Sequence, residues 1–336
     1  MAARLTVFFS SSPARVYLLP DSRQTVVGRD PGCDVVLDDD RVSRRHAILD
    51  PQEAGWSVSD TDSKNGILID GMPLASGLLK ERSWLSFGGL IARFETLREP
   101  VEKLAEERLR RFSTSIEVRR GLDPGVGLAE LLPRVVASML ELTNAERGFL
   151  LLADAEGDLE VAAHSGSSWE DVETREFGGS LGAVQRVLAT GGPVVSADAL
   201  ADAELGERAS VVVIGIRALL CVPIHALDRL IGVLYADSRQ PGAVFTELDL
   251  ELLEALAVQA GLAIAVARLD AELKGLAHQI AETPGADPGT RARLSGEVST
   301  VLERSLPAVR PAPVLEGIPK RWTGVLTAHA PLGIGP

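Results

Sequence analysis

Cationic and hydroxyl side chains gather in three short runs near the start of the chain. These are Gly28-Arg29, Ser43-Arg44-Arg45-His46 and Asp62-Ser63-Lys64-Asn65-Gly66. A guanidinium is a planar fork that can hold two oxygens of one anion, and hydroxyl or ammonium groups can donate to a third. A phosphorylated side chain carries about −1.5 to −2 charge and three acceptor oxygens. The residue types therefore suit the capture of one such dianion if the fold brings the runs together.

The elements around these runs are short strands. Apolar residues alternate with polar ones over Leu5–Phe9, Arg15–Leu19, Thr25–Val27, Val35–Leu37, Ala47–Leu49, Trp56–Val58, Ile67–Ile69, Trp84–Phe87 and Ile91–Phe94, and polar turns separate them. Many short strands with turns between them indicate a β-sandwich, and no helix of ordinary length fits in residues 1–97. Each cationic run then lies in a loop that follows a strand.

In their order and spacing, and with the turn Asp70-Gly71, these runs resemble the forkhead-associated (FHA) domain over roughly residues 5–96. The resemblance implies an all-β sandwich that binds phosphothreonine peptides through loops at one end. It implies that Arg29 and Ser43 contact the phosphate and that Arg44 flanks it. Lys64 then holds a further phosphate-facing position, and Asn65 holds the main chain of the peptide through its side-chain amide.

Four further residues are expected to support the site from within: Gly28, His46, Ser63 and Gly66. His46 is expected to be a semi-buried prop for the loop rather than a ligand-contacting group. The sequence departs from the usual family pattern at Ile67, where Thr is common, and at Asp70, where Asn is common. These departures concern strand packing and turn geometry, and the peptide preference stays open.

In residues 98–120 the spacing of the apolar residues changes from that of strands to that of a helix. Val101, Leu104, Leu109, Phe112 and Ile116 recur at mostly three- and four-residue spacing among Glu and Arg, which predicts an amphipathic connector helix that packs on a copy of itself or on another helix. Thr114 in this segment raises one alternative, in which its phosphorylated form would occupy the protein's own phosphate site.

Residues 121–270 mix helices and strands. A helical stripe runs over Leu128–Leu140, and two hairpins join 148–153 to 159–163 and 217–224 to 230–236. Ser180 can cap a helix that ends at Gly191, and Thr246 with Asp249 can begin a long apolar helix. This pattern predicts an α+β domain with an antiparallel sheet.

The block resembles the GAF domain over about residues 122–268, a small-molecule and dimerisation module of bacterial sensors. The resemblance rests on the helix around 131–142, the Ala145-Glu146-Arg147-Gly148 strand start, Ser180-Leu181-Gly182, the second hairpin and Phe245-Thr246. We nominate no residues for a GAF ligand, which stays unknown, and identify no cofactor and no metal site. Cys221 is interpreted as a buried, inert thiol, with redox turnover or bilin attachment as the alternative.

Residues 271–336 continue the long helix through Leu273, Leu276 and Ile280 at coiled-coil spacing. Beyond residue 282, many Pro and Gly and little periodicity predict a mostly disordered tail, with a brief helix at 291–305 and an isolated Trp322. The predicted organisation is therefore 1–97 FHA-like, 98–120 connector, 121–270 GAF-like and 271–336 helix extension and tail.

The composition limits the class of protein. The net charge of −13 resides in residues 121–270, which carry −14, and this argues against nucleic-acid binding there because phosphate contacts need Lys and Arg. We find no uninterrupted apolar run of about 20 residues, no signal peptide and no cysteine framework, and therefore expect a cytoplasmic protein away from membranes.

These observations predict a non-enzymatic signalling adaptor or regulator. It would bind a partner protein that an upstream Ser/Thr protein kinase has phosphorylated on threonine. It would also sense a small ligand or form a homodimer through the GAF-like domain. It resembles bacterial FHA–GAF signalling proteins without the ATPase and DNA-binding domains, since no phosphate loop and no catalytic constellation is visible. The alternatives are a transcription regulator that acts through the tail, related to enhancer-dependent activators, and an enzyme that uses Cys221.

Overall fold

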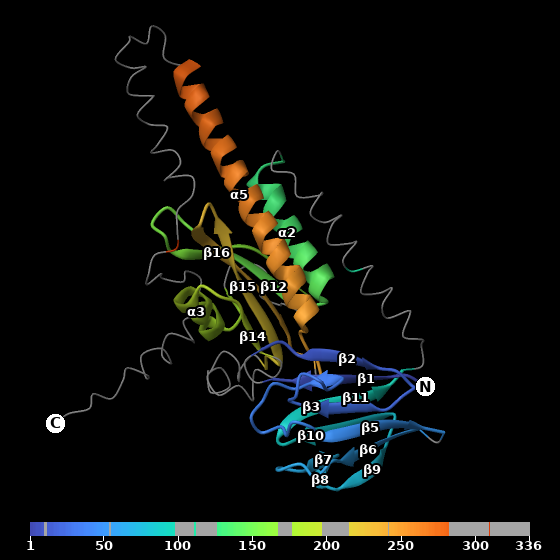
Figure 1. Cartoon of the computed structure of the whole chain (residues 1–336). Coiled ribbons are helices and arrows are strands. Elements are labelled where there is room, and N and C mark those ends of the chain that lie inside the picture. Colours follow the sequence, from blue (N-terminus) through green and yellow to red (C-terminus); the bar gives the residue numbers. More distant parts are fainter. Residues whose placement is uncertain are drawn as a thin grey trace, which may run out of the picture. The chain divides into compact units, whose positions relative to one another are not determined.

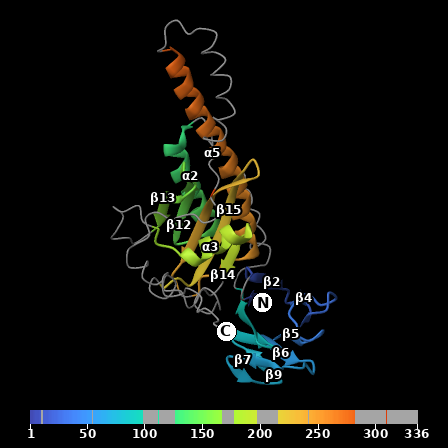
Figure 2. The ribbon, with the colours of Figure 1, turned by 90° about the vertical axis from the view of Figure 1, so that its left-hand side faces the viewer.

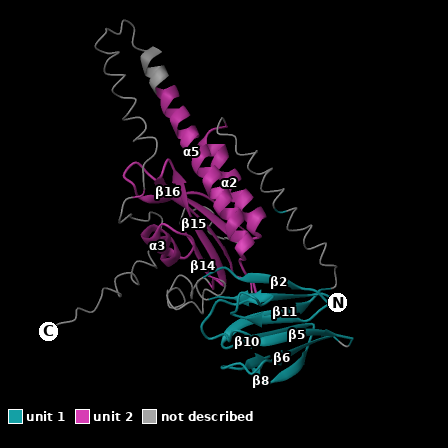
Figure 3. Ribbon diagram, viewed as in Figure 1, with its two compact units in different colours: residues 1–112 teal, residues 113–336 magenta. Residues whose placement is uncertain are grey.

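A computed structural model describes residues 1–9, 12–53, 55–97, 111, 126–166, 177–196, 215–240, 242–281 and 309, with side chains of the last helix described to Gly275 (Figure 1). The chain divides into two compact units, Met1–Phe112 and Ser113–Pro336 (Figure 3). Each unit has its own hydrophobic core and is taken by itself below.

The first unit is an all-β sandwich of two sheets, as the sequence predicts. One sheet has the order β2-β1-β11-β10-β7-β8 and the other has the order β4-β3-β5-β6-β9. The strands are β1 (Ala3–Phe8), β2 (Arg15–Leu19), β3 (Thr25–Gly28), β4 (Val35–Val36), β5 (Ala47–Gln52), β6 (Gly55–Asp60), β7 (Ile67–Ile69), β8 (Met72–Pro73), β9 (Ser76–Leu79), β10 (Arg82–Phe87) and β11 (Leu90–Thr96).

Alternation along the strands builds the sandwich core. Leu5 and Val7 of β1, Leu49 of β5 and Phe94 of β11 are fully buried, and their chain neighbours lie on the other face of each sheet. Trp56 is buried between the sheets against the ring of Phe94 and donates its indole N–H to the carbonyl oxygen of Met1 at 2.8 Å. A period of two residues thus places one face of each sheet in a shared core.

Asp70, one of the two positions where the sequence departs from the family pattern, forms the β7–β8 turn with Gly71. Both have positive φ, 50° and 84°, as a two-residue hairpin turn requires. The Asp70 carboxylate accepts from the backbone N–H of Trp84 at 2.9 Å and from Lys80 Nζ at 2.8 Å. Ile67 is buried in the core. Both departures therefore serve strand packing and the turn.

The second unit is an α+β domain with one antiparallel sheet in the order β13-β12-β16-β15-β14 (Figure 1). Its elements are α2 (Leu128–Thr143), β12 (Arg147–Ala153), β13 (Leu159–Gly166), α3 (Leu181–Thr190), β14 (Val194–Ser196), β15 (Ala218–Ala226), β16 (Arg229–Ser238) and α5 (Glu247–Ala281). The predicted hairpins and the α+β class are confirmed.

The central strands of this sheet are buried on both faces. Leu150 and Leu234 lie in the core beneath α2 and α5, whereas Phe149 and Tyr235 lie in a second core on the α3 side (Figure 2). This explains why the strand sequences are continuous apolar runs rather than alternating ones.

Helices α3 and α5 begin at the capping residues that the sequence indicates. The Ser180 hydroxyl caps α3, whose last turn closes at Gly191 with φ 69°. At the start of α5, the Asp249 carboxylate accepts from the N–H and hydroxyl of Thr246 at 2.6 and 2.7 Å. These contacts satisfy backbone donors that a helix N-terminus leaves free.

One described helix segment, Glu247–Gly275 of α5, is long and apolar enough by length and composition to cross a membrane. Charged residues interrupt this segment, so it contains no continuous apolar run of about 20 residues. In the structure, 56% of its most apolar window is buried, and it packs on α2 and β15 within the core of the unit. Burial in that core accounts for the apolar residues on the packed side of the helix.

Several sequence expectations lie outside the described residues. They are nearly the whole connector 98–120 with Thr114, the tail beyond residue 281 apart from Val309, the helix at 291–305 and Trp322. They stay predictions.

Candidate functional site

The loops that follow β3 and β4 are joined by their backbones at one end of the sandwich. The backbone N–H of Arg29 donates to the Ser43 carbonyl at 3.0 Å, and that of Asp30 donates to the Arg44 carbonyl at 3.1 Å. Gly28 makes this approach possible, because a Cβ there would lie 2.2 Å from the Arg44 carbonyl oxygen. The positions of Arg29 and Ser43 are therefore fixed relative to each other by main-chain contacts.

His46 connects this pair of loops to the loop between β6 and β7. Its side chain is fully buried, its Nδ1 accepts from the N–H of Ser43 at 3.0 Å, and its Nε2 lies 3.0 Å from the Gly66 carbonyl oxygen. An N–H donor on one side and a carbonyl on the other assign the proton to Nε2. The ring also packs edge-on against Phe87. His46 therefore holds two loops together through both nitrogens of its ring.

The Ser43 hydroxyl completes the junction of the loops. Its oxygen accepts from the backbone N–H of Lys64 at 3.0 Å. Because a hydroxyl has one hydrogen and two lone pairs, this contact leaves the hydroxyl hydrogen to be donated to a ligand. In the same loop, Ser63 Oγ accepts from the Gly66 N–H at 2.9 Å, and the Asp60 carboxylate accepts from the Ser63 N–H at 3.2 Å.

Asn65 is held from the other side. Its side-chain Nδ2 donates to the Arg41 carbonyl at 2.7 Å, which leaves the amide oxygen to accept from a peptide N–H. The Arg41 backbone lies close to the β10–β11 turn, where a Cβ on Gly88 would be 2.2 Å from the same carbonyl oxygen. Arg41 itself forms a bidentate pair with Asp39 and lowers the pKa of that carboxyl through their hydrogen bonds and its charge.

The charges of the sandwich separate into paired and unpaired cations. Arg29, Arg44, Arg45 and Lys64 are exposed, and no described carboxylate lies within ion-pair distance of any of them. The remaining basic side chains of residues 1–97 each contact a carboxylate or an aromatic ring: Arg4, Arg15, Arg23, Arg41, Lys80, Arg82 and Arg93. The unpaired cations thus all lie in the loops that the sequence singles out.

The structure brings the backbones of all the nominated segments together at this end of the sandwich. Sequence analysis missed Arg41, Asp39 and Gly88, which position Asn65 and the turn beside it. Only the Gly88-Gly89 pair after Phe87 gives a signal in the sequence, since adjacent glycines mark a tight turn or a close approach of backbones.

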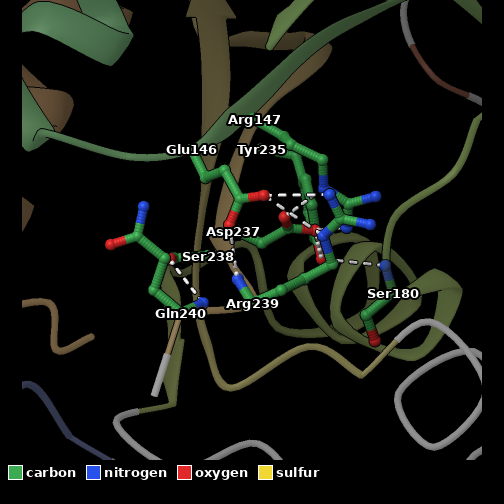
Figure 4. Close-up of polar contacts among 8 residues, drawn as sticks. All are labelled: Glu146, Arg147, Ser180, Tyr235, Asp237, Ser238, Arg239 and Gln240. Atoms are coloured by element: carbon green, nitrogen blue, oxygen red, sulfur yellow. Dashed lines mark hydrogen bonds and ion pairs between the residues drawn. The ribbon is translucent and has the colours of Figure 1, made fainter. Parts of the chain in front are cut away.

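The second unit contains a buried polar network that the sequence did not predict (Figure 4). Arg147 at the start of β12 pairs with Asp237 at the end of β16 through Nε and Nη2, at 2.6 and 2.5 Å. The Tyr235 hydroxyl donates to the Asp237 carboxylate at 3.0 Å and accepts from the Ser180 N–H at 2.9 Å. The network therefore fixes the start of α3 against the sheet.

Burial determines the ionisation of this network. It raises the pKa of Tyr235 well above its usual range, so the phenol keeps the proton that it donates. Desolvation would lower the pKa of Arg147, but the charge and hydrogen bonds of Asp237 raise it overall. Beside them, Glu146 accepts from the backbone and guanidinium of Arg239. The described polar groups of this network thus bind one another and hold β12, β16 and the start of α3 together.

Cys221 lies in β15 within the core on the α3 side and is fully buried. Burial raises its pKa well above the usual value, which disfavours the nucleophilic thiolate. Among the described residues, no group of three or more His, Cys, Asp or Glu side chains could hold a metal ion.

Comparison with known proteins identifies both units. The FHA domain family matches residues 25–88 and the GAF domain family matches residues 127–264. The chain therefore carries an FHA domain followed by a GAF domain, as the resemblances in its sequence predict. The match to the oxoglutarate dehydrogenase inhibitor of Corynebacterium diphtheriae is 37% identical over 70 residues, 21% of this chain and 49% of the relative. The chain thus spans about half the length of that relative.

Two solved structures are among those similar to parts of this chain. One comes from a study of phosphothreonine-dependent FHA domain interactions, with 20% identity and a TM-score of 0.28 over 30% of this chain and 100% of that chain. The other is free methionine-R-sulfoxide reductase from Neisseria meningitidis with its substrate, with 21% identity and a TM-score of 0.38 over 49% of this chain and 93% of that chain.

Proposed function

We propose that this chain is a non-enzymatic signalling adaptor whose FHA domain binds a partner protein phosphorylated on threonine. The observation that carries the proposal is that Arg29, Ser43, Arg44 and Lys64 stand on loops joined by hydrogen bonds of their backbones. Three of the four are exposed cations that pair with no described carboxylate. Cations and a hydroxyl on fixed loops suit a compact dianion. The FHA family match and the inhibitor named among the relatives support a regulatory role.

We assign the roles of the residues from their chemistry and, for Ser43 and Asn65, from the contacts that leave a hydroxyl hydrogen and an amide oxygen available. Arg29 supplies a fork for two phosphate oxygens, Ser43 donates its free hydroxyl hydrogen, and Arg44 and Lys64 add charge at the rim. Asn65 accepts from the main chain of the peptide through its amide oxygen. Asp38, Asp40 and Asp62 are exposed in the same loops, so the site favours a single phosphate over a polyanion such as nucleic acid.

The direct test uses an immobilised library of peptides with a central phosphothreonine and degenerate flanks, beside the same library with threonine. We expect wild-type protein to be retained only by the phosphorylated library. Arg29→Ala should weaken binding by roughly 2–5 kcal/mol, because phosphate charge would be left unpaired, and Lys64→Ala should weaken it less.

Arg23→Ala is the matched control, since Arg23 is also exposed but pairs with Asp34. Its binding should equal that of wild type. Equal retention of the two libraries by wild-type protein, or full binding by Arg29→Ala, would show the assignment to be wrong. Comparing captures from phosphatase-treated and untreated lysate would then identify the partner, and with it the upstream kinase.

The GAF domain is proposed to form a homodimer through α5. Val258, Leu262 and Val266 recur every four residues on this helix and are 66%, 59% and 41% exposed, although the opposite side of the helix is buried in the core. An apolar stripe on an exposed helix face suits pairing with the same stripe of a second copy. Sensing of a small ligand by this domain stays part of the proposal, with no residue assigned to it.

A further inference from the structure

The outer face of the six-stranded sheet in the FHA domain has an unusual composition. In a two-layer sandwich, this face is expected to be polar because it meets water. The strand registers instead place Val16 and Leu18 of β2, Trp84 of β10 and Ile91 of β11 on it. These side chains are between 38% and 49% exposed. The apolar composition of this face is therefore typical of a sheet surface that packs against another structural element.

Arginine side chains stand among these apolar groups. Arg4, Glu95 and Arg82 occupy one row across β1, β11 and β10. The Glu95 carboxylate lies 2.6 Å from Arg4 Nη2 and 3.3 Å from Arg82 Nε. Arg93 stands in the next row, beside Trp84. The Glu95 carboxylate thus forms ion pairs with more than one guanidinium, and the side chain of Arg82 remains 83% exposed.

This combination is typical of the centre of a protein–protein interface. Such centres are enriched in aromatic residues, Met and Arg and depleted in Lys and Glu. Among the described side chains that the registers assign to this face, arginines outnumber the single glutamate and no lysine occurs. The complementary surface must carry carboxylates opposite the arginines and apolar side chains opposite Trp84, Val16 and Leu18.

We propose that this face, defined by Val16, Leu18, Trp84, Ile91, Arg4 and Arg82, docks an acidic amphipathic helix of a partner protein. A helix supplies an apolar stripe and flanking carboxylates in one element, and it is the layer that most simply covers a sheet. The docking does not depend on phosphothreonine binding, because it uses none of the loop residues Arg29, Ser43 and Lys64.

The test is binding of the full chain to a labelled synthetic amphipathic peptide with a leucine stripe flanked by glutamates and no tryptophan. The comparison peptide has lysine in place of every glutamate. Fluorescence anisotropy should show binding of the acidic peptide and binding about tenfold weaker for the lysine version, because the face is cationic. Trp84 emission should shift to shorter wavelength as the peptide covers the ring.

Trp84→Ser and Arg82→Glu should each weaken binding of the acidic peptide by about fivefold or more, since they remove the apolar anchor and reverse the exposed charge. Leu78→Ser, on β9 of the other sheet, and Arg217→Glu, in the GAF domain, are matched controls and should bind as wild type does. Arg29→Ala should also bind normally, which separates this surface from the phosphate site. Thermal melting should show that each variant is folded.

Three results would overturn the proposal. The first is no binding of the acidic peptide to wild-type protein, and the second is equal binding of the two peptides, which would mean non-specific apolar adhesion. The third is a dimer in sedimentation that Trp84→Ser dissociates, which would assign the face to a second copy of the chain.

Discussion

At the scale of single residues, the loops of the proposed phosphate site depend on side chains to which we assign no phosphate contact. His46 is the clearest case, because one buried imidazole satisfies a backbone donor in one loop and a backbone acceptor in another. Removing it takes the partner from two part-buried backbone groups, and a fully buried group left in that way costs about 1–3 kcal/mol.

We therefore expect His46→Leu to lower the free energy of unfolding of the sandwich by about 2–5 kcal/mol, since it adds the loss of both contacts. Phosphopeptide affinity should fall with it, because the loops that carry Ser43 and Gly66 lose their common support. Urea denaturation and peptide titration check this. His164→Leu, at an exposed position on β13, should change neither quantity, and unaltered affinity in His46→Leu would contradict the supporting role.

Glu95 makes the stability of the folded sandwich depend on pH. Burial would raise the pKa of Glu95, but the hydrogen bond from Arg4 and the charges of Arg93, Arg4 and Arg82 lower it overall. A carboxyl whose pKa is lower in the folded state stabilises that state fully above its unfolded pKa of about 4.3. This stability is lost as the pH falls through the folded pKa.

The urea midpoint of the sandwich, followed by NMR signals of its strands, should therefore fall as the pH is lowered from 5 to 3. Part of this fall should vanish in Glu95→Gln, which has no carboxyl to protonate. Glu53→Gln, at an exposed turn position, should keep the whole wild-type slope. A slope in Glu95→Gln as steep as in wild type would remove Glu95 from the explanation.

At the scale of elements, the Arg147–Asp237 pair joins β12 to β16 and, through Tyr235, to the start of α3. Asp237→Leu should destabilise the GAF domain by about 3–5 kcal/mol, because the Arg147 charge would be left buried without its partner. The double variant Arg147→Met with Asp237→Leu should recover much of this loss, since no charge then remains.

Thermal and urea unfolding of the four proteins in this double-mutant cycle measure the coupling. Lys274→Met with Asp270→Leu, an exposed pair on α5, provides the control cycle and should show little coupling. Additive losses at Arg147 and Asp237 would mean that the pair does not act as a unit.

Most elements could be predicted from sequence because their signals are local. The alternation of Leu5 and Val7, the cap at Ser180 and the Thr246–Asp249 pair each require only neighbouring residues. The Arg147–Asp237 pair could not, because its partners are 90 positions apart and both occur in strands that read as apolar. The same holds for the contact of Asn65 with Arg41, which depends on how two loops meet.

At the scale of the whole molecule, the chain folds into two units with separate cores. We propose peptide binding for the first unit and dimer formation for the second. If α5 joins two copies through Val258, Leu262 and Val266, each dimer presents two phosphate sites. Two linked sites can bind a doubly phosphorylated partner or an array of partners far more tightly than one site does.

Leu262→Glu should therefore convert the dimer to a monomer in sedimentation or light scattering, because it places like charges in the middle of the apolar stripe. Binding of one phosphopeptide should be unaffected. Leu74→Glu, at an exposed position of the sandwich, should leave the mass unchanged. A monomeric wild-type protein, or a Leu262→Glu protein that keeps its dimer mass, would contradict the assignment of this stripe.

The close approach at Gly28 has a consequence for protein engineering. The strand end and the neighbouring loop meet through peptide groups, with no room for even a methyl group between them. At this contact the loop shape is encoded by the main chain, whereas Ser43, Ser63 and Asn65 also hold the loops through their side chains. Exposed side chains outside those contacts, Arg45 among them, could be randomised in a display library while the scaffold stays intact. Such a library would turn this end of the sandwich into a source of affinity reagents for chosen phosphorylated sequences.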